Sequence, residues 1–252
     1  MPEAAQVTRT SAGAAPDRPR RRPLATAFGV FGELFLTAGA VLLLFVVWQL
    51  WWTNLDAGRT QETAVERALE GFAGTPARDA AGEPAGNPML EGDTFAVMYV
   101  PRFGEDFARP VTAGVGLDVL NTLGIGHYPE TQMPGEKGNF AVAAHRQTYG
   151  EAFREIHRLR DGDLIYVQTA KGFYTYAYRS TQIVQPSAAE VLAPVPGRPG
   201  EKPTEAVLTM TSCDPPFTTR MRIVAVSALE SFTPAADGPP AAIAATVAKL
   251  QK

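Results

Sequence analysis

The segment Ala206-Val-Leu-Thr-Met-Thr-Ser-Cys213 is typical of a β-strand, because it is built almost entirely from β-branched and apolar residues. Successive side chains of a strand point to opposite faces, so Thr209, Thr211 and Cys213 are expected on one face. Ser212 then belongs to the other face, together with the leucine and methionine. Turn-forming residues follow Cys213, so the strand ends there. We therefore expect an accessible thiol beside a groove lined by threonine.

Cys213 is the only cysteine among the 252 residues. Exported proteins mostly use cysteine in disulfides, which need a second cysteine, so a single thiol outside the cytoplasm suggests a chemical role. The alternative is an inert thiol that packs as a small apolar side chain. The groups expected near the thiol bear on this choice.

Similar short segments recur between residues 93 and 232, separated by glycine, proline and polar turn residues. This rhythm predicts one closed or sandwiched β domain, interrupted by short helices at residues 116–123 and 151–159. The predicted strands cover residues 94–100, 139–144, 164–168, 172–184, 206–212 and 222–229.

Residues 34–52 (LFLTAGAVLLLFVVWQLWW) carry no charge and predict a transmembrane helix. Nineteen helical residues span about 28 Å, close to the ~30 Å hydrocarbon core of a bilayer. The apolar stretch is longer than that of a cleaved signal peptide, so a retained anchor is expected. Arginines at positions 18, 20, 21 and 22 precede it, against one acidic and one basic residue just after it. The positive-inside rule therefore places the N-terminus in the cytoplasm and the β domain outside the cell membrane.

The rest of the chain is expected to connect or flank these two parts. Residues 1–22 have few large apolar side chains and predict a disordered cytoplasmic tail, and residues 23–33 are juxtamembrane. Residues 53–92 start with a helical pattern and continue as a Gly/Pro/Ala-rich flexible linker outside the membrane. Residues 233–252 are Ala/Pro-rich and predict a mobile C-terminal tail.

A nucleophilic thiol needs an imidazole or a fixed positive charge nearby, because the thiolate is the reactive species. His145 follows a predicted strand, in a polar strand-end position like that of the thiol. His127 lies in a turn-forming stretch and His157 in a predicted helical patch, so both are weaker candidates. Arg220 and Arg222 enter the strand after the thiol, and a hairpin would bring them beside it as oxyanion donors.

The composition argues against several other functions. The net charge is −3 and the β domain has no basic stripe, so nucleic-acid binding is unsupported. One cysteine and three scattered histidines lack the spacing of a zinc site. We expect no metal and no other cofactor.

Several segments together resemble the sortases, the membrane-anchored cysteine transpeptidases of Gram-positive cell surfaces. The segments are Gly126-His-Tyr-Pro-Glu-Thr-Gln-Met-Pro-Gly135, Asn139-Phe-Ala-Val-Ala-Ala-His-Arg146, Leu159-Arg-Asp-Gly-Asp-Leu-Ile-Tyr-Val167 and Thr209-Met-Thr-Ser-Cys213 with a downstream arginine. The resemblance covers about residues 93–232 and looks closest to the class E housekeeping type of actinobacteria. Two motifs depart from the family pattern: Thr-Leu-x-Thr-Cys is here Thr-Met-Thr-Ser-Cys, and Gly-His-Arg is Ala-His-Arg.

The resemblance implies a closed eight-stranded β-barrel with short helices, preceded by one transmembrane helix. It also implies a sorting signal of the LAxTG or LPxTG kind on secreted proteins, cut between threonine and glycine through a thioester and passed to an amine of a peptidoglycan precursor. The implied site residues are Cys213 as nucleophile, His145 as acid and base, Arg222 as the carbonyl-positioning arginine, and Thr209, Thr211 and Ser212 as substrate-binding residues.

Two alternatives stay open from the residues alone. Papain-like and NlpC/P60-like cell-wall hydrolases also use cysteine and histidine, but they place the cysteine before the histidine in the chain, whereas all three histidines here precede Cys213. A membrane-tethered β-barrel binding domain would need only a buried, inert Cys213.

Overall fold

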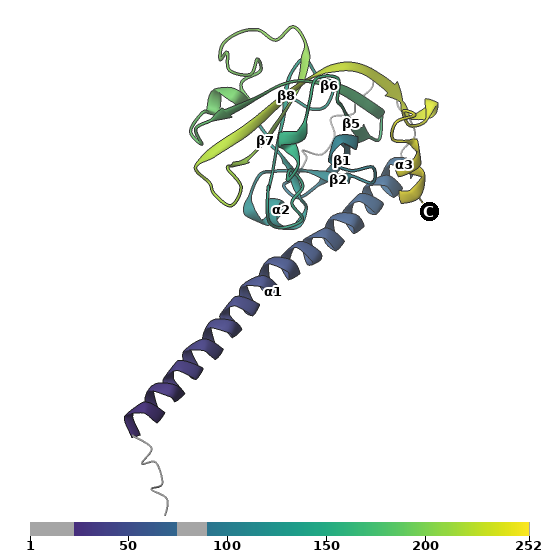
Figure 1. The fold of residues 1–252 in the computed structure, drawn as a ribbon. Helices are drawn as coiled ribbons and strands as arrows, with labels where there is room; N and C mark the ends of the chain where they lie inside the picture. The colour runs from purple at the N-terminus through teal and green to yellow at the C-terminus, as the bar shows by residue number, and fades with distance from the viewer. Residues whose placement is uncertain (1–22, 75–89, 252) are drawn as a thin grey trace, which may run out of the picture. The chain divides into compact units, whose positions relative to one another are not determined.

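The computed structural model describes residues 23–74 and 90–251, and its main element is a closed β-barrel (Figure 1). In this part of the chain the strands follow one another around the barrel as β1-β2-β3-β4-β7-β8-β6-β5. The strands are β1 (Thr94–Tyr99), β2 (Ala108–Ala113), β3 (Ile125–His127), β4 (Gly138–Ala144), β5 (Leu164–Thr169), β6 (Gly172–Val184), β7 (Ala206–Asp214) and β8 (Met221–Pro234). The prediction of a closed eight-stranded barrel is confirmed.

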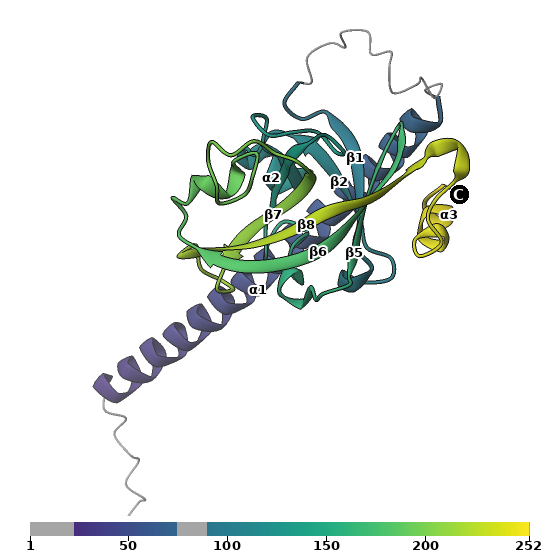
Figure 2. The ribbon, with the colours of Figure 1, turned by 90° about the horizontal axis from the view of Figure 1, so that it is seen from above.

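Two pairs of neighbouring strands are parallel, namely β2 with β3 and β4 with β7. The other neighbours are antiparallel, and the long β6 and β8 lie side by side across the barrel (Figure 2). The parallel pairs matter for function, because parallel strands end at the same rim of the barrel.

The sequence analysis did not predict two of the strands, β2 and β3. β2 contains Pro110, and a proline inside a run argues against a strand because it cannot donate a ladder hydrogen bond. β3 has only three residues, too few to display an alternating pattern. The structure forms both because neighbouring strands supply their partners: Pro110 pairs with Val97 of β1, and Ile125 pairs with Ala144 of β4.

The short helices agree with the sequence in part. Helix α2 (Leu117–Thr122) lies where a helical patch was predicted. The other patch forms only the 3₁₀ turn η2 (Ile156–Arg158), because Glu151 adopts a left-handed backbone with φ of 50° that no α-helix accepts. Further 3₁₀ turns are η1 (Pro101–Phe103), η3 (Ala189–Leu192) and η4 (Ala235–Asp237).

The barrel interior is filled by the alternate residues of its strands. Leu208 and Met210 of β7 are fully buried in this core, together with Phe140 and Val142 of β4. Alternation therefore places Thr209, Thr211 and Cys213 on the outer side of the wall. This is the face that the sequence pattern predicts for them.

Helix α1 (Pro23–Gly74) has two parts. The part up to Trp48 belongs to one compact unit, and the part from Gln49 belongs to the same unit as the barrel. The first part exposes large apolar side chains and is long and apolar enough to cross a membrane. In the second unit, Val65 and Leu69 pack against Val97 and Tyr99 of β1. The structure thus continues as one helix through residue 53, where the sequence analysis placed a boundary.

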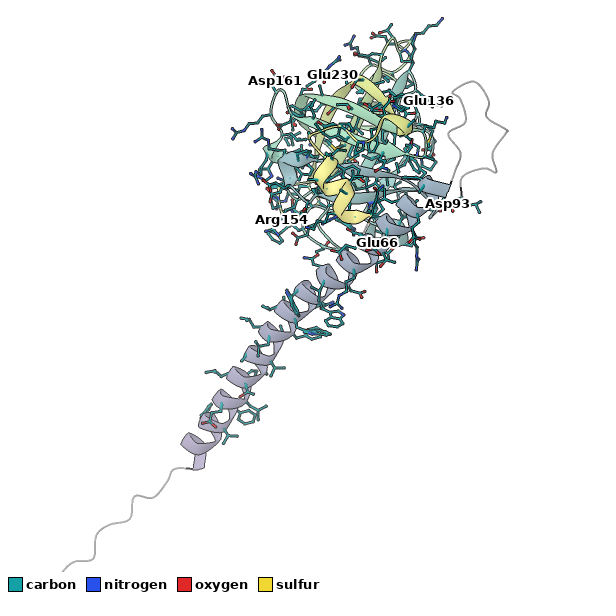
Figure 3. The ribbon with its side chains drawn as sticks, turned by 90° about the vertical axis from the view of Figure 1, so that its right-hand side faces the viewer. Glu66, Asp93, Glu136, Arg154, Asp161 and Glu230 are labelled. Carbon is teal, nitrogen blue, oxygen red and sulfur yellow. The ribbon has the colours of Figure 1, made fainter. Side chains whose placement is uncertain are left out.

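The C-terminal residues differ from the prediction of a mobile tail. β8 extends to Pro234, and helix α3 (Ala244–Leu250) follows it. Ile243 and Val247 are buried in the same cluster as Leu69 of α1, and Figure 3 shows α3 beside the end of α1 near Glu66. The apolar residues of this segment therefore pack against the domain. The tail predicted at residues 1–22 and most of the linker lie outside the described residues.

Candidate active site

The parallel pair β4 and β7 brings His145 and Cys213 to the same rim of the barrel. In the register of this pair Ala143 lies opposite Thr211. The Ser212 hydroxyl donates a 2.7 Å hydrogen bond to the Ala144 carbonyl, which continues the register by one residue. One step further along both strands, His145 follows β4 beside Cys213. The 68 residues that separate the two in sequence are bridged by strand pairing.

The antiparallel pair β7 and β8 adds an arginine on the other side of the thiol. Cys213 pairs directly with Arg222, so both side chains leave the sheet on the same face. The Nη1 group of Arg222 donates 3.0 Å hydrogen bonds to the carbonyls of Thr219 and Met221. Arg220 lies before the start of β8 and is exposed. The register distinguishes the two arginines, which the sequence spacing alone did not.

We call His145, Cys213 and Arg222 the rim row, because they occupy neighbouring positions at the ends of β4, β7 and β8. All three are half-buried, so none is a fully packed core residue. A thiol, an imidazole and a guanidinium in this order supply a nucleophile, a proton donor and acceptor, and a hydrogen-bond donor for an oxyanion. The row therefore has the groups needed for acyl transfer.

Two side chains outside the strands hold the imidazole. His145 Nε2 lies 2.8 Å from Oδ1 of Asn121 on α2, and the Tyr149 ring lies against the imidazole with centroids 5.3 Å apart. Because an amide oxygen accepts, Nε2 carries the proton of the neutral ring and Nδ1 is the basic nitrogen. Burial lowers the pKa of His145 from its ordinary value, because it penalises the charged form. Sequence reasoning missed Asn121, since no motif marks it.

A buried ion pair joins the ends of β4 and β7 next to the row. The Arg146 guanidinium is only 5% exposed and pairs with the Asp214 carboxylate. The same guanidinium nitrogen donates a 3.2 Å hydrogen bond to the Cys213 carbonyl. Arg146 directly follows His145, and Asp214 directly follows Cys213, so this ion pair holds the ends of β4 and β7 together.

The predicted threonine-lined groove differs from the structure. Thr211 donates to the Val142 carbonyl at 3.2 Å, and Ser212 bonds to the Ala144 carbonyl of the same strand. Thr209 is fully buried, and within the described residues its hydroxyl has no hydrogen-bond partner. All three side chains are buried in the structure. The hydroxyls of Thr211 and Ser212 bond to carbonyls of β4, which the alternation pattern could not reveal.

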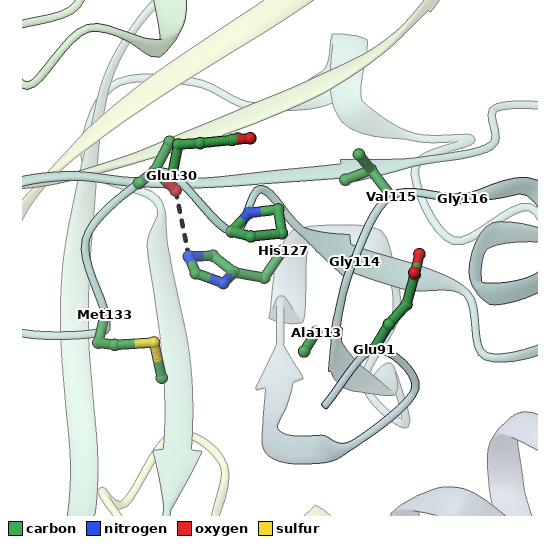
Figure 4. A pocket seen from close by; sticks show the side chains of 10 residues that line it. Glu91, Ala113, Gly114, Val115, Gly116, His127, Glu130 and Met133 are labelled. Atoms are coloured by element: carbon green, nitrogen blue, oxygen red, sulfur yellow. Dashed lines mark hydrogen bonds between the residues drawn. The ribbon is translucent and has the colours of Figure 1, made fainter. Parts of the chain in front are cut away.

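The other two histidines lie apart from the row. His127 of β3 is 3% exposed and packs between Phe95 and Phe140, and its Nε2 lies 3.1 Å from the Gln132 carbonyl. Burial lowers its pKa. It lines a cavity of about 670 Å³, where Figure 4 shows it between Glu130 and Met133 on one side and Ala113 on the other. His157 is exposed on η2.

Comparison with known proteins points to one family. The family model described as Sortase domain matches residues 98–230. Sortase SrtE1 of Streptomyces coelicolor is 35% identical over 219 residues, which cover 84% of this chain and 60% of that relative. Sortase SrtE2 of the same organism is 35% identical over 222 residues, which cover 82% of this chain and 85% of the relative. The solved structure of Streptomyces coelicolor Sortase E1 with a tripeptide in the active site has a TM-score of 0.56 and 35% identity, covering 60% of this chain and 97% of that one.

Proposed function

Because the chain belongs to the sortase family, we propose that it is a membrane-anchored cysteine transpeptidase with its reaction centre at the rim row. The observation that carries the proposal is the register of β7. Cys213 pairs with Arg222 of β8. When the pairing of β7 with β4 is continued past Thr211 and Ala143, Cys213 falls beside His145. Cys213 is the nucleophile, His145 the acid and base, and Arg222 the oxyanion donor.

The proposed reaction has two acyl-transfer steps. The Cys213 thiolate attacks the carbonyl carbon of the scissile peptide bond, and Arg222 hydrogen-bonds to the oxygen that gains negative charge. The tetrahedral intermediate breaks its C–N bond, His145 protonates the departing amine, and a thioester remains on Cys213. A second amine then attacks the thioester, His145 accepts a proton from it, and the thiolate leaves. The products are a new amide and the free enzyme.

The proposed first substrate is a C-terminal sorting signal of the LAxTG or LPxTG kind on a secreted protein, cleaved between threonine and glycine. Support comes from the Streptomyces coelicolor Sortase E1 structure, which holds a tripeptide in its active site. The proposed second substrate is an amine of a peptidoglycan precursor. Both substrates would be held near the outer membrane face, which suits an enzyme that is tethered there.

The proposed location is the cell membrane, with a cytoplasmic N-terminus and an extracellular barrel. The apolar first part of α1 supports anchoring, and the tryptophans at 48, 51 and 52 suit one membrane interface. The arginines at positions 18, 20, 21 and 22 support the orientation.

The experiment that tests this function uses the full chain in detergent micelles with synthetic peptides. Peptides varied at the second position of the signal are incubated with the protein, with and without a small amine. We expect a mass increase on the peptide that contains Cys213 that equals the acyl fragment up to threonine, and an amide product when amine is added. Cleavage without any adduct on Cys213 would contradict the proposal.

Arg222 is expected to contribute more than any other arginine of the β7–β8 hairpin. Replacing Arg222 with alanine removes a charged oxyanion donor, which in comparable sites costs about 10²- to 10³-fold in kcat. Arg220→Ala is the matched control, because Arg220 is two residues away and exposed, and its kcat is expected to stay within about two-fold of wild type. Steady-state transpeptidation rates measure both, and a larger loss for Arg220→Ala would assign the role to that residue instead.

A further inference from the structure

The second part of α1 contacts the loop that follows His145. Asn54 Nδ2 donates a 2.6 Å hydrogen bond to the Glu151 carboxylate, and Asn54 Oδ1 accepts one of 3.2 Å from the Gly150 N–H. One asparagine therefore holds both the backbone and a side chain of this loop. Residue 54 lies in the same compact unit as the barrel.

A second residue of α1 enters more deeply. Gln61 is 1% exposed, and its Nε2 donates a 3.0 Å hydrogen bond to the Tyr149 carbonyl. A Cβ at Gly150 would lie 2.5 Å from Gln61 Nε2, and a Cβ at Gly124 would lie 2.9 Å from Gln61 Cδ. Gly150 has a φ of +85° and Gly124 a φ of +87°, and a residue with a side chain is strained in this conformation. The two glycines thus form a slot that the Gln61 amide fills.

The two segments that form this slot carry the two side chains that hold the His145 imidazole. Gly150 directly follows Tyr149, whose ring lies against His145. Gly124 comes three residues after Asn121, which is hydrogen-bonded to His145. A change in the position of Gln61 would therefore alter both contacts of the His145 imidazole, the one with Tyr149 and the one with Asn121.

The loop after His145 also needs outside support. Tyr149 and Glu151 both have left-handed backbones, with φ of 55° and 50°. Such a conformation is strained for a non-glycine residue and persists only where the surroundings hold it. The hydrogen bonds from Asn54 and Gln61 reach the three residues 149–151 and provide that support.

We propose that Asn54 and Gln61 of α1 are positioning residues for His145, so that the helix leading from the membrane anchor is a working part of the active site. The inference rests on the proposed function, because it assumes that His145 is the acid and base. It also changes the role of residues 53–74, which the sequence analysis assigned to an extracellular connector. This segment sets the geometry of catalysis.

The test compares variants of the full chain in detergent micelles. Gln61→Met keeps the volume of the buried side chain and removes the donor to Tyr149; within the described residues, Gln61 Oε1 has no partner, so the change also removes one unsatisfied acceptor. Because the Tyr149 carbonyl loses its donor, the melting temperature is expected to fall, so kcat is measured at a temperature where variant and wild type are both folded. We expect kcat to fall about 10-fold with KM within about two-fold of wild type, because the imidazole is misplaced while the peptide still binds. Asn54→Ala is expected to act in the same way.

Thr63→Ala is the matched control on the same helix. Thr63 is exposed, and its hydroxyl donates to the Arg59 carbonyl of its own helix. Its kcat is expected to stay within about two-fold of wild type.

A polarity swap tests positioning apart from fold stability. Asn54→Asp keeps the acceptor for Gly150 but sets two carboxylates against each other at Glu151, so kcat is expected to fall about 10-fold. The double variant Asn54→Asp with Glu151→Gln restores a donor and acceptor pair and is expected to recover most of the lost kcat. Recovery of turnover with the swap supports a positioning role, because the swap restores no other contact of α1.

The outcomes separate this inference from the proposed function. If Cys213→Ala is inactive in the same preparation but Asn54→Ala and Gln61→Met turn over like wild type, only the positioning inference is overturned. It is also overturned if kcat falls only in step with the melting temperature and the swap recovers nothing. If Cys213→Ala stays active, the proposed function itself is wrong.

Discussion

Cys213→Ala is expected to abolish acyl-enzyme formation and to lower transpeptidation by at least about 10⁴-fold, because the reaction has no other nucleophile on the rim row. Cys213 is half-buried at the end of β7, so the loss of its sulfur should change the unfolding free energy by less than about 1 kcal/mol. Intact-protein mass spectrometry after incubation with a sorting-signal peptide measures the adduct. A parallel thermal melt checks the fold.

The control for Cys213→Ala is the same assay on the protein after its thiol has been alkylated. Alkylation and substitution should remove activity equally, since both remove the thiolate. Residual transpeptidation in Cys213→Ala beyond the background of peptide alone would contradict the assignment.

The second large effect is expected at His145. His145→Ala should lower kcat/KM by about 10²- to 10⁴-fold, because both acyl-transfer steps need a proton donor or acceptor at the reacting nitrogen. Steady-state assays over a range of pH measure it. Because acylation needs the protonated imidazole, kcat/KM should fall as the pH rises through the pKa of His145, which burial lowers from its ordinary value, and His145→Ala should lose this alkaline limb.

Two histidine controls accompany this measurement. His157 is exposed on η2, so His157→Ala should leave turnover within about two-fold of wild type. His127 is buried between two phenylalanines, so His127→Ala should lower thermal stability while the molecules that remain folded keep their turnover. Loss of turnover in His157→Ala equal to that in His145→Ala would remove His145 from the mechanism.

Much of the site was visible in the sequence because strand patterns carry chemical information. The alternation in residues 206–213 predicted both the strand and the face on which Cys213 lies, and the strand before His145 was equally clear. The resemblance to the sortases brought Arg222 forward, whereas the spacing alone left Arg220 and Arg222 as alternatives. The strand predictions rest on local periodicity, which depends only on neighbouring residues.

Other parts of the site could not be read in this way. Asn121 lies on a short helix with no motif, and Arg146 becomes important only because Asp214 comes to its side. The sequence also could not show that the Thr211 and Ser212 hydroxyls bond to barrel carbonyls and that Thr209 is buried, and the substrate-binding role expected for these three residues stays a prediction. Each of these facts depends on residues distant in the chain.

By itself the sequence determined the apolar helix, most of the strands, the inner and outer faces of β7 and the identity of the thiol, because these follow from local periodicity and composition. Only the tertiary structure decided which strands are parallel, which arginine lies opposite Cys213, and which side chains hold His145. It also decided that Asn54 and Gln61 of α1 reach the loop behind the imidazole, and that the C-terminal residues pack beside α1. The physical reason is that a contact between distant segments depends on how strands pair and helices dock, and local sequence does not encode the partner.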